Sequence, residues 1–63
     1  MDKTPADTMA EVASLRQAAE NYRHLAEQRT TAGDGQIAEK LMELVRDLEG
    51  RAADLEATLP KAG

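Results

Sequence analysis

The 63-residue sequence contains no cysteine, phenylalanine or tryptophan, and it has a single tyrosine and a single histidine. Without cysteine there are no disulfide bonds, which are a common way to stabilise small domains. A structural zinc site is poorly supported too, because such sites are built mainly from thiolates and imidazoles. We therefore expect no metal and no cofactor. Association with another chain is the remaining way to stabilise so short a sequence.

Long apolar runs are also missing. No run approaches the roughly 20 apolar residues that cross a membrane, and residues 1–5 lack the hydrophobic stretch of a signal peptide. These absences predict a cytoplasmic protein that makes no use of a membrane. The net charge of −4 argues against a protein whose affinity comes from neutralising nucleic-acid phosphates or anionic lipids.

Alanine, glutamate, leucine and arginine dominate the composition, as is typical of helical bundles and coiled coils. The few β-branched residues do not alternate as they would in strands. A first helix is predicted over residues 5–31, because Thr4 can cap it, Pro5 suits its first position and Asp7 can complete a capping box.

The segment that follows predicts a tight turn over about residues 32–34. Gly33 suits the end of one helix, and Asp34 suits the N-cap of the next. The second helix is predicted over about 35–58, because Leu59 precedes Pro60 and is biased away from helical geometry. Residues 60–63 are expected to fray. The chain is thus predicted to be one all-α unit over residues 1–63, an antiparallel two-helix hairpin.

Each predicted helix carries one apolar stripe. Folding the chain about Gly33 sets large residues opposite small ones, for example Leu15 near Ala52 and Leu48 near Ala19. In the second helix the stripe repeats with steps of four, three and four, which gives an eleven-residue period. The first stripe contains Thr8, Val12, Leu15, Ala19, Tyr22 and Ala26, and the second contains Ile37, Leu41, Leu44, Leu48, Ala52, Leu55 and Leu59.

Two helices cover only one side of each stripe, so a flank of the leucine row stays in water unless a partner covers it. Two hairpins related by a twofold axis would form a four-helix bundle, and this homodimer is favoured over a hairpin that docks on a larger protein. The predicted oligomer interface consists of Val12, Leu15, Ala19, Tyr22, Leu25, Ile37, Leu41, Leu44, Val45, Leu48 and Leu55.

Three arginines of the first helix, Arg16, Arg23 and Arg29, are candidate contacts for a partner or for nucleic acid. The favoured interpretation is a solvated surface, because oppositely charged residues four apart on a helix pair with one another. The pairs expected on this basis are Arg16 with Glu20, Arg23 with Glu27, and Asp47 with Arg51.

Catalysis and metal binding have little support in the sequence. Glu20, His24 and Glu27 share one helix face, but that face lies opposite the apolar stripe and is expected to be solvated. Tyr22 lies on the apolar stripe, and His24 points away from it. No glycine-rich phosphate loop, nucleophile elbow or Ser/His/Asp set is present. The sequence therefore predicts a protein without enzyme activity.

The stretches 22–27, 37–41 and 48–52 resemble short bacterial helical-hairpin proteins of uncharacterised function. In length and single-hairpin plan the chain is also similar to Rop, a plasmid copy-number regulator whose hairpins dimerise into a four-helix bundle that binds paired RNA loops. This similarity concerns architecture and not a binding motif. We expect a structural or regulatory interaction module that self-associates. The alternatives are a Rop-like nucleic-acid regulator and a helical adaptor or inhibitor of a larger protein.

Overall fold

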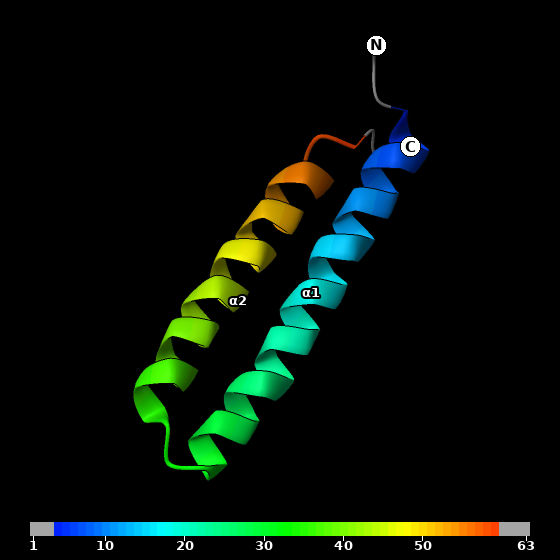
Figure 1. Cartoon of the computed structure of the whole chain (residues 1–63). Helices are drawn as coiled ribbons and strands as arrows, with labels where there is room; N and C mark the ends of the chain where they lie inside the picture. The colour runs from blue at the N-terminus through cyan, green and yellow to red at the C-terminus, as the bar shows by residue number, and fades with distance from the viewer. Residues whose placement is uncertain (1–3, 60–63) are drawn as a thin grey trace.

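The computed structural model describes residues 4–59 and contains two helices, α1 (Pro5–Thr31) and α2 (Gly35–Glu56). They run antiparallel and side by side from the turn to the open end of the hairpin (Figure 1). No strand occurs among the described residues. The predicted all-α hairpin is confirmed, although α2 ends at Glu56 and not at Thr58. The predicted frayed segment 60–63 lies outside the described residues.

The capping box predicted at the start of α1 is present. The backbone N–H of Asp7 donates to Thr4 Oγ1 at 3.2 Å, and the N–H of Thr4 donates to Asp7 Oδ2 at 3.4 Å. Pro5 occupies the first turn, where its missing N–H would have no helical partner in any case. Local sequence therefore fixes the beginning of α1 without help from tertiary contacts.

A Schellman motif ends α1. The N–H of Asp34 donates to the carbonyl of Arg29 at 2.8 Å, and the N–H of Gly33 donates to the carbonyl of Thr30 at 3.1 Å. Gly33 has a φ of 88°, a left-handed conformation that other residues adopt with strain. This geometry reverses the chain within three residues and directs α2 back along α1.

Asp34 differs from the prediction in one respect. It occupies the N-cap position of α2, but its side chain makes no capping hydrogen bond. Its Oδ2 lies instead 3.6 Å from Nη1 of Arg29, at the end of α1. The carboxylate is therefore placed to link the two sides of the turn, and it does not satisfy the amides of α2.

The most deeply buried side chains form a seam of small residues between the two helices. They recur every seven positions in both helices, which is the heptad period of a coiled coil and not the eleven-residue period predicted for α2. Each is at most 5% exposed. The seam consists of Val12, Ala19 and Ala26 from α1 and Ala38, Val45 and Ala52 from α2.

The leucine stripe of α2 lies beside this seam and not in its centre. Leu41, Leu48 and Leu55 are only partly buried, and Leu44 is 47% exposed. At about 100° per residue, the stripe is centred roughly 60° around α2 from the seam. Alanine at the contact lets the helix axes come close together, since interaxial distance depends on the side chains between them. The larger leucines then lie to one side.

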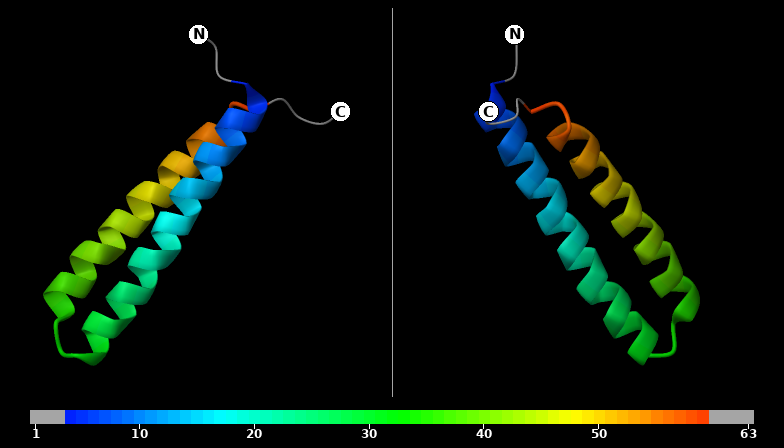
Figure 2. Two further views of the ribbon diagram at one scale, coloured as in Figure 1. Left: turned by 45° about the vertical axis from the view of Figure 1, so that its right-hand side comes forward. Right: turned by 180° about the vertical axis from the view of Figure 1, so that it is seen from behind.

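The hairpin is a single layer of two helices, as two further views in Figure 2 illustrate. Its extents are 47 × 23 × 14 Å, and the smallest of these is little more than the diameter of about 10–12 Å of one helix with side chains. Within the described residues, neither helix has the length and apolarity that a membrane crossing requires. Both broad faces of the layer are open to solvent or to a partner.

Candidate interaction site

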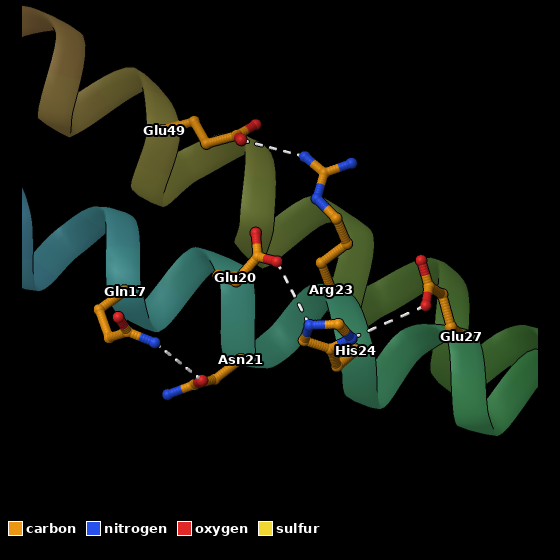
Figure 3. Close-up of polar contacts among 7 residues, drawn as sticks. All are labelled: Gln17, Glu20, Asn21, Arg23, His24, Glu27 and Glu49. Carbon is orange, nitrogen blue, oxygen red and sulfur yellow. Dashed lines mark hydrogen bonds and ion pairs between the residues drawn. The ribbon is translucent and has the colours of Figure 1, made fainter.

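Two ion pairs identify one broad face of the hairpin. Arg16 of α1 reaches Glu56 of α2 at 2.9 Å, and Arg23 reaches Glu49 at 3.0 Å. Figure 3 shows the second of these pairs crossing from α1 to α2. All four residues follow a seam residue by four positions. Positions of this kind on α1 and α2 therefore lie on the same side of the seam, which we call the ion-paired face.

The opposite broad face is apolar. A residue three positions after a seam residue is turned by about 100° from one that is four positions after it, so it lies across the seam. Residues immediately before a seam residue lie on the same side. The apolar face defined in this way consists of Leu15, Ala18, Tyr22 and Leu25 from α1 and Ile37, Leu41, Leu44, Leu48 and Leu55 from α2.

The apolar face remains substantially accessible to solvent. Tyr22 is 39% exposed and Ile37 is 50% exposed, and the remaining residues of the face are partly buried or exposed. The apolar face therefore presents apolar side chains of both helices to solvent. Except for Val12, Ala19 and Val45, all residues of the predicted oligomer interface lie on this face.

Val12, Ala19 and Val45 have a different location. They are 5%, 2% and 0% exposed, respectively, because they pack in the seam between α1 and α2. The fold thus places them between the two helices of one chain and not on the apolar face. Ala18, which the sequence-based list of interface residues omits, lies on the apolar face instead.

The accessible surface of the chain is 4980 Å², whereas a globular monomer of its mass exposes about 4000 Å². The difference of roughly 1000 Å² fits the elongated shape of the hairpin, whose extents are 47 × 23 × 14 Å.

The arginines predicted as partner or nucleic-acid contacts do not form one surface. Arg16 and Arg23 lie on the ion-paired face, whereas Arg29 follows Ala26 by three positions and lies on the other side of the seam. Each guanidinium lies within 4 Å of a carboxylate, that of Asp34 in the case of Arg29. The described residues therefore offer no continuous array of arginines to a phosphate backbone.

The partners of Arg16 and Arg23 correct the sequence-based pairing. Both arginines were expected to bind a glutamate four residues later in α1, and both instead bind a glutamate of α2. The expected pair of Asp47 and Arg51 is confirmed at 3.2 Å. The i, i+4 rule considers one helix at a time, so it does not include acceptors that the neighbouring helix supplies.

His24 lies between two carboxylates along α1 (Figure 3). Its Nε2 is 3.3 Å from Glu20 Oε1, and its Nδ1 is 3.9 Å from Glu27 Oε2. All three side chains are more than half exposed. No cluster of three or more histidine, cysteine or acidic residues within residues 4–59 has the arrangement of a metal site. The arrangement is that of solvated helix pairs.

An open groove near the end of the hairpin opposite the turn was not predicted from the sequence. It lies on the ion-paired face, where the Arg16–Glu56 pair forms part of its wall. Its other residues come from positions 9–20 of α1 and from Leu59, so only the antiparallel fold brings them together. The groove is lined by Met9, Val12, Ala13, Arg16, Gln17, Glu20, Glu56 and Leu59.

Comparison of the chain with family models, with curated proteins and with solved structures gives no match.

Proposed function

We propose that this protein is a small, non-catalytic interaction module of structural or regulatory role, which self-associates through its apolar face into a four-helix bundle. The observation that carries the proposal is the position of the large apolar residues. Most of them lie together on one broad face, whereas Met9 and Met42 lie on the opposite face, which is crossed by ion pairs within the chain.

The seam inside one hairpin gives a reason for association. Four of its six residues are alanines, and each alanine removes little more than one methyl group from water. A single core in a chain of this size rarely supplies more than about 3–5 kcal/mol. Covering the partly exposed leucines would add apolar burial at about 25 cal/mol per Å². Folding and association should therefore be coupled.

The alternative of a nucleic-acid-binding regulator is less well supported. It relies on Arg16, Arg23 and Arg29 as a joint phosphate-binding surface, but these residues lie on two sides of the seam and each faces a carboxylate. Exchanging those carboxylates for phosphates would leave the acids without partners in a protein of net charge −4. Self-association requires no such exchange.

Sedimentation combined with thermal melting tests the proposal. We expect a dimer at micromolar concentration, and a melting temperature that rises with protein concentration because the dimer binds only folded chains. A stably folded monomer at these concentrations, with a melting temperature independent of concentration, would contradict it. A hairpin that stays monomeric alone and binds only a co-purified protein would support the adaptor alternative.

A further inference from the structure

We propose that the second copy lies inverted on the apolar face, so that the turn of each hairpin covers the open end of the other. This inference rests on the proposed self-association and adds the orientation of the partner. It is drawn from the distribution of charge along the hairpin, from the order of residues along α1 and from the position of Ala18.

When the helices of the two copies are aligned, as in a four-helix bundle, two twofold arrangements bring the same broad face of two hairpins together. If the axis runs parallel to the helices, both turns lie at the same end of the bundle and α1 packs on α2 of the partner. If the axis runs across the helices within the contact plane, the turns lie at opposite ends. In that inverted arrangement α1 packs on the partner's α1, and α2 packs on the partner's α2.

The charge of the hairpin is concentrated at its open end. Residues 4–18 and 47–59 carry six carboxylates and two arginines, a net charge of −4. Residues 19–46, around the turn, carry five carboxylates and four basic side chains, a net charge of −1. Two copies in the same direction would bring −4 against −4 at one end, whereas inverted copies bring −4 against −1 at each end.

The length of the hairpin makes this difference effective. The molecule is 47 Å long, and charges in physiological salt are screened over about 8 Å. Repulsion is therefore felt mainly between groups at the same end of the bundle. Inversion spreads the acidic groups over both ends, which lowers the repulsion that a dimer must overcome.

The α1 residues on the apolar side of the seam also change from acidic to basic between the open end and the turn. It begins with Glu11 near the open end, continues through Ala18 and ends with Arg29 near the turn. When two such rows lie antiparallel about Ala18, Glu11 of each copy lies at the same end as Arg29 of the other, offset along the helix axis by four residues, or about 6 Å. In the same-direction arrangement both copies place Arg29 at one end and Glu11 at the other.

Ala18 lies at the centre of α1, which spans Pro5–Thr31. An inverted pair therefore brings Ala18 close to Ala18 of the second copy. Its small side chain allows the two α1 helices to approach at this point, and Leu15 and Tyr22 on either side can pack around it. We place the twofold axis next to Ala18.

Spin labels at the turn end distinguish the two arrangements. The sequence has no cysteine, so Thr31→Cys gives a single labelling site, and Thr31 is exposed in the hairpin. It lies 13 residues after Ala18, so at 1.5 Å per residue the two sites of an inverted dimer are separated by about 40 Å. In the same-direction dimer they lie within about 20 Å, given helix spacings of roughly 10 Å.

Pulsed electron resonance on the labelled dimer is therefore expected to give a distance near 40 Å. A dimer by sedimentation with a distance below about 20 Å would overturn the inverted orientation and leave self-association intact. A labelled protein that sediments as a folded monomer would contradict the proposed function itself. The two failures are thus distinguishable in one sample.

Cysteine cross-linking tests the position of the axis. We expect Ala18→Cys to form a disulfide-linked dimer on oxidation, because the two Cβ atoms would lie close to the axis. Ala13→Cys, on the wall of the groove in the ion-paired face, is the matched control and should stay largely unlinked. Equal linking of the two variants, or no link at position 18 in a protein that remains dimeric, would overturn the axis at Ala18.

Discussion

The two broad faces of the hairpin differ in how they are completed. On the ion-paired face, arginines of α1 and glutamates of α2 complete one another within the chain. On the apolar face, the leucines have only each other and the flank of an alanine-rich seam. The hairpin thus joins its helices mainly through small hydrophobic residues and leaves most of its larger ones partly exposed on one face.

A charge on the apolar face should have the largest effect. Leu48→Asp should abolish the dimer and most of the helical structure, because a carboxylate buried there without a partner costs several kcal/mol of a small total stability. Ala53→Asp introduces the same charge at an exposed position of α2 and should keep both. Circular dichroism and sedimentation measure the two outcomes. Dimers of equal stability would show that Leu48 stays in water.

Enlarging the seam tests whether small residues are needed there. Ala19 is 2% exposed between the helices, so Ala19→Leu should lower the free energy of unfolding by about 1–3 kcal/mol through overpacking. Ala10→Leu makes the same change at an exposed position of α1 and should have little effect. Chemical denaturation measures both. A leucine at position 19 that stabilises the protein would show that the seam has room to spare.

Trimming one exposed apolar residue on each face compares them directly. Leu44 and Met9 are 47% and 61% exposed, and they lie on the apolar and ion-paired faces, respectively. Leu44→Ala should weaken the dimer by about tenfold or more, equivalent to roughly 1.4 kcal/mol, because apolar area is lost from the contact. Met9→Ala should leave the dissociation constant unchanged. Sedimentation equilibrium measures it, and the reverse result would assign the contact to the other face.

Gly50 lies on the outer side of α2, away from α1, and belongs to neither broad face. A Cβ added at Gly50 would meet no atom within 4 Å, so Gly50→Ala should stabilise the protein by about 0.5–1 kcal/mol through helix propensity. Gly33→Ala should destabilise it by about 1–2 kcal/mol, since φ there is 88°. Thermal denaturation measures both. Loss of the dimer in Gly50→Ala would show that a partner approaches this side.

The smallest effect is expected on the ion-paired face. A double-mutant cycle of Arg23→Ala and Glu49→Ala should give a coupling energy below about 1 kcal/mol, because both side chains are roughly half exposed. The coupling should also decrease with added salt. A coupling of several kcal/mol, independent of salt, would mean that this face is covered and would reverse the roles assigned to the two faces.

The local features of the fold could be predicted from the sequence. Thr4, Pro5 and Asp7 specify the start of α1, and Gly33 specifies its end, because each acts through backbone groups a few residues away. The predicted hairpin followed directly from these signals. They depend on chemistry within one turn of helix, which a sequence displays in full.

The seam could not be located in the same way. Hydrophobicity ranks leucine above alanine, so a helical wheel of α2 is centred on the leucine row and gives an eleven-residue period. The closest approach of two helices is decided by size as well, and it follows Ala38, Val45 and Ala52. That choice depends on both helices together and is absent from either pattern alone.

The candidate site was predicted in outline and altered in detail for the same reason. Leu25 and Leu41 were expected to face a partner, and they lie on the apolar face. Val45 was also expected there, but the shift of the seam around α2 buries it within the chain. The carboxylates that bind Arg16 and Arg23 likewise come from α2 and not from α1. The position of the seam decides which side chains of the two helices meet.

The thickness of 14 Å has a consequence for the motion of the backbone. In a molecule one helix thick, each backbone amide is separated from water by a single layer of side chains at most. Amide hydrogens of an isolated hairpin should therefore exchange with solvent through small local openings, and few should require global unfolding. Slow exchange confined to amides beneath the apolar face would record how long a partner stays bound.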